Sequence, residues 1–302
     1  MTSTTVEGAP ARTIDLSSST SVSRRLADVG FLLFLWLSLA LALGTLVVLL
    51  TDVFTEGRPR LTWELISNMP SARPARAGIQ SAIFGSLWVV GITAAISLPL
   101  GIGAAIYLEE FADPERWSNR LIELNVQNLA SVPSVVYGIL GLAFIARGPL
   151  GLGFTVITAA LILVLVVLPT VVIASREALR AVPTSLREGS LALGATEWQT
   201  VQRQVLPAAI PGIATGSILS TSRALGESAP LLLTGALTFV TFNPGGLDSA
   251  YTVLPIQIFR WVSEARLEFR PLAAAASVVL LVVLLGMNAT AILVRNRFEK
   301  KL

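Results

Sequence analysis

The sequence predicts an all-α membrane protein, a bundle of six transmembrane helices with a polar helix-turn-helix loop between the fourth and the fifth. Hydrophobic residues make up 53% of its 302 residues and charged residues only 14%, and its mean hydropathy is +0.73. A soluble domain carries about 25% charged residues. The chain is therefore too apolar for a soluble domain, and at ~20 residues for each crossing it has room for about six crossings.

Six apolar runs give the predicted spans. Arg24 and Arg25 precede the first run, and a basic tail that begins at Arg295 follows the last. Because Lys and Arg are enriched in cytoplasmic segments, these clusters predict a multi-pass protein of the plasma or inner membrane with both termini in the cytoplasm. The predicted spans are residues 29–50, 78–108, 126–146, 154–174, 213–239 and 271–294.

The chain is predicted to divide into four parts. Residues 1–22 are rich in Ser and Thr and poor in large apolar residues, so we expect a disordered cytoplasmic tail. Residues 23–76 hold the first span and a polar outside loop, and residues 77–297 hold the other five spans as one transmembrane core. Residues 298–302 complete the basic cytoplasmic tail.

Three segments carry further expectations. Pro133 breaks the third span, whose polar side chains indicate burial against protein or water. The fourth span is rich in Val and Leu, and we expect much of its surface to face lipid. Residues 254–262 show helical apolar spacing with Trp261 at one edge, which predicts an interfacial helix on the outer side.

The composition excludes several classes of function. The chain has no Cys and no His, which removes disulfides, thiol nucleophiles, imidazole catalysis and the usual zinc sites. It also lacks the G-x-x-x-x-G-K-[ST] pattern of a P-loop, so we expect no ATP on this chain. The net charge of +3 indicates orientation in the membrane rather than a nucleic-acid partner. We expect no enzyme activity, metal or cofactor on the chain itself.

The polar stretch 181–212 organises the rest of the chain. Thr184 and Ser185 can cap a first short helix, and Ser185 together with Glu188 fits a capping box. This helix is predicted to end near Leu193, because Gly194 permits the left-handed turn that often closes a helix.

A second capping box, Thr196 with Gln199, predicts another short helix that stops before Pro207. Two short helices that meet at a glycine make a compact knob. Trp198 in the second helix is either an aromatic anchor for a partner protein or a ring half-buried at the lipid surface.

The stretch resembles the "EAA" loop of ABC-transporter permease subunits, in which Glu-Ala-Ala is followed after three residues by Gly and after nine more by Ile-x-Leu-Pro. In that family the loop is a pair of coupling helices that docks on an ATPase subunit. The resemblance implies a type I permease fold, with ATP and Mg bound by the partner ATPase. We call residues 184–206 the coupling loop. The residues that match the family pattern are Glu188, Gly194, Leu206 and Pro207.

The loop departs from the family pattern at three positions. Gly189 and Ser190 stand where the family usually has two alanines, and Gln204 stands where it usually has Ile. These changes leave the spacing and the turn intact, so they bear on the affinity for the ATPase, whose densest contact is expected from Glu188 to Trp198. Two other interpretations of the loop stay open: a connector with no partner, and a DNA-reading helix-turn-helix.

Two charged residues, Arg223 and Glu227, lie inside the predicted spans. A charge at the centre of a membrane helix costs about 2.5–3.5 kcal/mol on insertion scales, so such residues are functional candidates. At a rise of about 1.5 Å per residue, Arg223 lies about 15 Å from the inner end of its span. Glu227 would lie one turn further on the same face. The pair either serves a translocation pathway for an oxyanion or fixes the packing of the span.

The segment from Arg223 to Leu231 resembles the corresponding stretch of phosphate-transport permease subunits of the PstA kind. The run from Leu254 and the ending with Asn288 resemble the same subunit. The resemblance spans about residues 77–297. It implies import of inorganic phosphate by a complex with a second homologous permease subunit, two ATPase subunits and an extracytoplasmic phosphate-binding protein, all organised around the lipid bilayer.

Two other functions stay open from the residues. One is an ABC permease for another substrate, such as sulfate, molybdate or an amino acid, which only the neighbourhood of Arg223 separates from a phosphate permease. The other is a stand-alone secondary transporter that uses Arg223 and Glu227 as an ion relay. A relay usually needs more titratable groups inside the membrane, and the sequence shows no evident inverted repeat.

Overall fold

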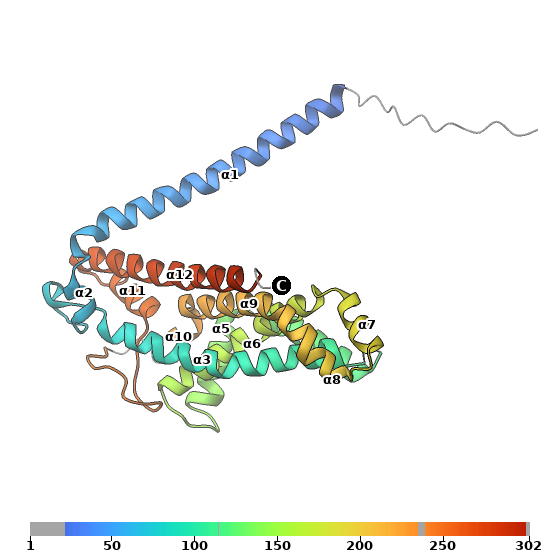
Figure 1. The fold of residues 1–302 in the computed structure, drawn as a ribbon. Helices are drawn as coiled ribbons and strands as arrows, with labels where there is room; N and C mark the ends of the chain where they lie inside the picture. Colours follow the sequence, from blue (N-terminus) through green and yellow to red (C-terminus); the bar gives the residue numbers. More distant parts are fainter. Residues whose placement is uncertain (1–21, 114, 235–238, 300–302) are drawn as a thin grey trace, which may run out of the picture. The chain divides into compact units, whose positions relative to one another are not determined.

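The computed structural model describes residues 22–113, 115–234 and 239–299. The predicted disordered tail, apart from its last residue, and the end of the predicted basic tail lie outside these ranges. The described residues form helices and loops and contain no strand (Figure 1). The chain divides into two units, Met1–Asp52 and Val53–Leu302.

The helical elements follow one another in a simple order along the chain. The α-helices of the described residues are α1 (Val22–Gly57), α2 (Trp63–Ser67), α3 (Gln80–Ile106), α4 (Trp117–Ser131), α5 (Ser134–Leu140), α6 (Val156–Arg180), α7 (Thr184–Ala192), α8 (Glu197–Thr200), α9 (Leu206–Gly226), α10 (Ala229–Leu232), α11 (Leu254–Val262) and α12 (Arg270–Glu299). Three π-helical turns extend α3, α5 and α8, and these are Tyr107–Phe111, Gly141–Ala146 and Val201–Val205.

The first unit contains most of α1. This helix has no charged residue between positions 29 and 50, and the stretch Leu26–Arg60 is long and apolar enough to cross a membrane. A continuous helix of this kind satisfies all its backbone polar groups internally, as hydrocarbon requires. The first predicted span is therefore confirmed as a helix.

The remaining predicted spans occur as four further long helices and one bent pair. The long apolar stretches are Gln80–Phe111, Val156–Arg180, Glu197–Leu232 and Leu267–Arg297. The bent pair is α4 with α5 and its π-helical turn, and the two parts differ in direction by 101°. The described residues thus contain five helices long and apolar enough to cross a membrane, or six candidate spans if the bent pair counts as one, which agrees with the predicted fold class.

The bend lies where the sequence placed a break in the third span. Val132 is extended, with φ −67° and ψ 131°, because the residue before a proline is disfavoured in the helical region. Pro133 is the N-cap of α5, which runs in the new direction. Helix α4 begins at Trp117, before the expected start of this span at residue 126. Gln127 and Asn128 on α4 are exposed, so they are not buried against protein within the described ranges, and the alternative of contact with water stays a prediction.

The core of the second unit is built around α6. Helices α3, α6, α9 and α12 pack beside one another, with α7 and α8 at one end and α2 and α11 at the other (Figure 1). In α6, 61% of the most apolar stretch is buried, against 33% in α3 and 39% in the stretch containing α9. The expectation that this span faces lipid was wrong. A helix that is apolar on all sides is better placed in the centre of a bundle.

Small residues bring α6 and α9 into close contact. A Cβ atom added at Gly212 would lie 2.8 Å from the Cβ of Ala178, and one added at Gly216 would lie 2.7 Å from the Cβ of Ala174. Both pairs are spaced by four residues, the small-xxx-small pattern that allows helix backbones to approach closely in membranes. This contact therefore fixes the distance between the helices that precede and follow the coupling loop.

The segment after Phe239 covers the end of the bundle opposite α7 and α8. The Val156 N–H donates to the Ser249 carbonyl at 3.1 Å, and the Ile157 N–H donates to the Leu247 carbonyl at 2.9 Å. These bonds satisfy two of the N–H groups that the start of a helix leaves without an intrahelical partner. Helix α11 was predicted with the correct bounds. Its Trp261, expected at one edge of an interfacial helix, is instead buried and stacks on Phe269 with ring centroids 6.3 Å apart.

Replacing Gly216 by Leu should destabilise the bundle, because the new side chain would meet Ala174 before it could be accommodated. Overpacking of this kind costs about 1–3 kcal/mol, so the midpoint of thermal unfolding in detergent, followed by tryptophan fluorescence, should fall. Gly91→Leu is the matched control, since no atom lies within 4 Å of a Cβ added at Gly91 in α3. Equal midpoints for the two variants would contradict the close contact of α6 and α9.

Candidate functional site

The coupling loop has the predicted plan of two short helices joined at a glycine. Helix α7 ends at Ala192, and Gly194 follows with φ +84°. A residue with a Cβ is strained in this left-handed conformation, whereas glycine is not. The Gly194 N–H donates to the Leu191 carbonyl at 2.9 Å, which closes the helix as the sequence indicated.

One of the two predicted capping boxes is present. The Thr196 hydroxyl accepts from the Gln199 N–H at 3.2 Å, and the Gln199 side-chain oxygen accepts from the Thr196 N–H at 3.0 Å. The box predicted for Ser185 and Glu188 was wrong. Helix α7 starts earlier, behind Pro183 as its N-cap with no side-chain cap, so Ser185 already lies inside the first turn.

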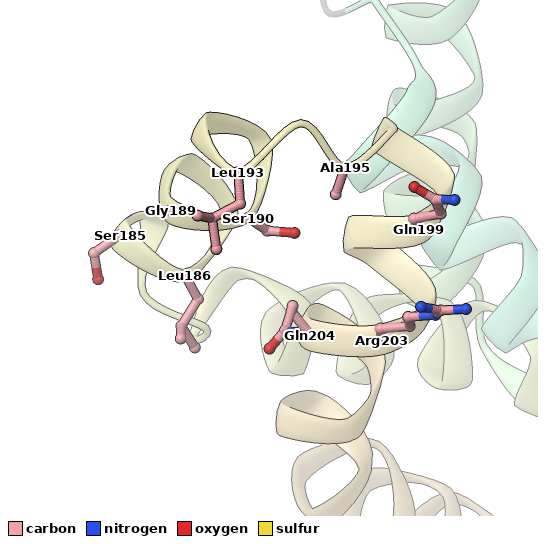
Figure 2. A pocket seen from close by; sticks show the side chains of 9 residues that line it. All are labelled: Ser185, Leu186, Gly189, Ser190, Leu193, Ala195, Gln199, Arg203 and Gln204. Atoms are coloured by element: carbon pink, nitrogen blue, oxygen red, sulfur yellow. The ribbon is translucent and has the colours of Figure 1, made fainter.

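A hydrogen bond and an open cavity characterise the space between the two halves of the loop. The hydroxyls of Ser190 and Thr200 lie 2.9 Å apart and brace α7 against α8. Beside them is a cavity of about 370 Å³, with α7 on one wall and α8 and its π-helical turn on the other (Figure 2). The residues that line it are Ser185, Leu186, Gly189, Ser190, Leu193, Ala195, Gln199, Arg203 and Gln204.

The second helix of the loop does not stop before Pro207, contrary to the prediction. It passes through the π-helical turn, in which the Leu206 N–H donates to the Val201 carbonyl, and continues directly as α9. Proline lacks an N–H but is tolerated in the first turn of a helix, and the wider π turn accommodates it by shifting the hydrogen bonds by one residue. The loop and the fifth span are therefore joined by uninterrupted helical backbone.

The predicted docking residues lie mostly on the surface of the loop. Glu188, Gly189 and Pro207 are exposed, while Ser190 and Leu206 are half-buried. Trp198 is 57% exposed and contacts the ring of Phe111, with centroids 6.1 Å apart. Their surface position suits contact with another protein, and their predicted roles in docking stay predictions.

An ion pair that the sequence analysis missed holds the loop against the end of α3. The Arg187 guanidinium binds both carboxylate oxygens of Glu110, at 2.6 and 3.1 Å. It also donates to the carbonyls of Val182 and Leu179, at 2.8 and 3.0 Å. The hydrogen bond to Glu110 raises the pKa of Arg187 above its usual value, although burial opposes this. Removing one partner would leave the other uncompensated, which for buried pairs costs about 3–5 kcal/mol.

A second charged cluster lies next to this pair and joins α3, α4 and α6. Glu109 accepts from Arg176 at 3.2 Å and from Arg180 at 2.8 Å, and Glu123 of α4 lies 3.0 Å from Arg176. Arg176 and Arg180 are four residues apart, so they share one face of the helix. That spacing, together with two adjacent carboxylates directly after the second span, was the signal in the sequence that could have predicted this cluster.

The structure separates Arg223 from Glu227. Helix α9 ends at Gly226, and Glu227 is extended with ψ 116°, so the two side chains do not lie one turn apart on a helical face. No ion pair joins them within the described ranges. Arg223 is exposed and Glu227 is half-buried. The expected helical pair was wrong, and Arg223 keeps its guanidinium available at the end of a broken span.

The stretch of α9 that leads to Arg223 is polar for a span. The hydroxyls of Ser217 and Ser222 are buried and make no hydrogen bond within the part of the chain that the structure describes. Helix α10 follows the break, and its Pro230 packs closely on α5, where a Cβ added at Gly138 would lie 2.7 Å from the Pro230 Cα. The two interrupted helices, α4 with α5 and α9 with α10, therefore meet near the end of α9 that carries Arg223. In membrane proteins such breaks occur where backbone is buried in protein or lines a cavity.

The fold and this loop define a multi-span membrane component of a transport system, and the comparison with a family model agrees. The model described as "Binding-protein-dependent transport system inner membrane component" matches residues 97–301. The chain therefore belongs to this family, and it is a multi-pass membrane protein that works as one component of a transporter complex. This confirms the resemblance found in the sequence.

Individual relatives support the same family. The chain is 37% identical over 226 residues to the "Probable ABC transporter permease protein YqgI" of Bacillus subtilis, which covers 73% of this chain and 74% of the relative. It is 32% identical over 280 residues to the "Phosphate transport system permease protein PstA 1" of Mycobacterium tuberculosis, which covers 91% and 90%.

Solved structures share the fold at low sequence identity. A bacterial alginate ABC transporter, in complex with an alginate-bound periplasmic protein, matches with a TM-score of 0.63 and 17% identity over 89% of this chain and 94% of that chain. The MetNI methionine ABC transporter in an inward-facing conformation matches with a TM-score of 0.58 and 18% identity over 72% and 94%.

Replacing Gly194 by Ala should loosen the coupling loop while leaving the bundle folded. The left-handed conformation costs a residue with a Cβ about 1–2 kcal/mol, so trypsin should cleave faster after Arg187 or Arg203 in limited proteolysis. Gly189→Ala is the control, because Gly189 lies inside α7 with open space around it and alanine favours a helix there. Equal cleavage rates for both variants would contradict the role of Gly194 as the loop's turn.

Proposed function

We propose that this chain is one of two permease subunits of an ATP-driven importer of inorganic phosphate. The similarity to subunits named for phosphate transport extends over most of the chain, and the chain supplies an exposed guanidinium within a span at Arg223. The observation that carries the proposal is the uninterrupted helix from the coupling loop through α9 to Arg223. It gives a partner that moves the loop a direct mechanical path to a candidate anion-binding residue.

In this proposal the chain works in the plasma or inner membrane with both termini in the cytoplasm. It pairs with a second homologous permease subunit, and an extracytoplasmic phosphate-binding protein delivers the substrate. Two copies of an ATPase subunit bind ATP and Mg, and one of them contacts the coupling loop between Glu188 and Trp198. Closure of the ATPase dimer then shifts the bundle between two states because its contacts with the loop differ in each state.

The chemistry of Arg223 suits a tetrahedral oxyanion. A guanidinium is planar, stays protonated at all physiological pH values and donates paired hydrogen bonds to two oxygens of one anion. No carboxylate of the described residues is paired with it. Glu227, at the break after α9, would repel an anion or hold Arg223 only in a state with different geometry.

Arg223→Ala should abolish phosphate uptake by the assembled transporter in proteoliposomes, whereas Arg223→Lys should keep a reduced rate because it retains the charge without the fork. Uptake is measured with radiolabelled phosphate and internal ATP. Arg270→Ala, which removes an exposed charge at the start of α12, should leave uptake unchanged. Normal uptake by Arg223→Ala would mean that this residue does not contact the substrate. Sulfate or molybdate uptake in place of phosphate would assign the chain to a different substrate.

Glu188→Lys should leave the protein in the membrane but uncouple transport from ATP hydrolysis, because it reverses a charge in the expected contact with the ATPase. The measurements are co-purification with the ATPase subunit and uptake per ATP hydrolysed. Glu115→Lys, at an exposed position outside the coupling loop, is the matched control. Substrate flux by the chain reconstituted alone would overturn the proposal in favour of a stand-alone transporter.

A further inference from the structure

We propose that Arg187 and Glu110 form a clamp through which movement of the coupling loop reaches α3. The inference rests on the proposed function, since it describes how a loop driven by an ATPase acts on the bundle. It assigns a positioning role to two residues outside the family pattern of the loop. Neither residue contacts the candidate anion site at Arg223.

The need for such a clamp follows from the connections of the loop. The backbone joins the loop to α6 through the turn at Pro183 and to α9 through the π-helical turn. It does not join the loop to α3, whose end lies more than 70 residues earlier in the sequence. The ring contact of Trp198 with Phe111 is one link to that end. The Arg187–Glu110 pair is the charged link, and it has the shorter and more directional contacts.

The geometry of Arg187 is that of a fixed joint. Its guanidinium donates two hydrogen bonds to one carboxylate, one to the Leu179 carbonyl at the end of α6 and one to the Val182 carbonyl just after α6. The Glu110 side chain is 6% exposed and that of Arg187 is 23% exposed. A rigid planar fork can hold these directions at once, whereas the single ammonium of Lys cannot. A rotation of α7 therefore pulls on α3 and α6 together.

The π-helical turn Tyr107–Phe111 passes movement of α7 on to the neighbouring helices. Adjacent residues of a helix point in different directions, so Glu110 faces α7 while Glu109 faces Arg176 and Arg180 of α6. Through Glu123 the same arginines also hold α4. The clamp thus connects the loop to three helices, of which α3 and α4 have no short backbone connection to the loop.

The clamp is tested on the complete transporter in proteoliposomes, by measuring phosphate uptake and ATP hydrolysis in the same vesicles. Glu110→Gln and Arg187→Lys should each lower uptake per ATP hydrolysed about tenfold, within the range of coupling between sites in proteins. The double variant should lose little more than either single variant, because both remove the same link. Arg120→Gln, which removes an exposed charge of α4 with no ion pair among the described residues, is the control.

Two outcomes would overturn the clamp. One is an unchanged ratio of uptake to hydrolysis in both variants. The other is loss of the ATPase subunit from the purified complex, which would make Arg187 a docking residue rather than a link to α3.

A distance measurement separates the clamp from the identity of the substrate. The chain has no cysteine, so spin labels can be placed at Leu191→Cys in α7 and Tyr107→Cys at the end of α3, where the native side chains are 46% and 51% exposed. With the clamp intact, the distribution of distances between the labels should keep a single narrow peak when ATP is added to the complex. In Arg187→Gln it should broaden or shift. Identical distributions in both proteins would overturn the clamp, whereas failure of the wild type to take up phosphate would overturn only the proposed substrate.

Discussion

The close contact between α6 and α9 is the constraint on which the rest of the bundle depends. In lipid the hydrophobic effect does not drive helices together, so packing between small residues supplies much of the attraction. Gly212 and Gly216 of α9 allow this approach to Ala174 and Ala178 of α6. Because the coupling loop leaves the bundle at the end of α6 and returns into α9, the same contact fixes the separation of the loop's two ends.

Charged contacts hold the loop end of the bundle, where packing of small residues gives way to longer side chains. The carboxylates of Glu109 and Glu110 extend from the π-helical end of α3 to arginines of α6 and α7. An ion pair of this kind is directional and depends on both partners, unlike an apolar contact. The two kinds of contact therefore have different roles: the apolar middle sets the positions of the helices, and the charged end connects them to the loop.

Local signals were the ones that sequence reasoning interpreted correctly. Gly194 turns the loop and Thr196 caps its second half because these features depend on neighbours within a few residues. Predictions failed where contacts between residues far apart in the sequence decide the structure. The Val- and Leu-rich fourth span became the centre of the bundle, since composition does not distinguish lipid from protein as surroundings. Pro207 did not end its helix, because the π-helical turn before it shifts the backbone hydrogen bonds by one residue and accommodates a residue without an N–H. Glu227 does not lie on the helical face, because α9 ends one residue before it.

The sequence by itself determined that the chain is a helical membrane protein with a glycine-centred coupling loop, since apolar run length, capping residues and glycine spacing act locally along the chain. Only the tertiary structure decided which helix is central, that the loop continues into α9 without interruption, and that Arg187 and Glu110 meet. These features join residues from separate helices. Their distances follow from how the side chains of α3, α6 and α9 pack together, which the order of residues alone does not specify.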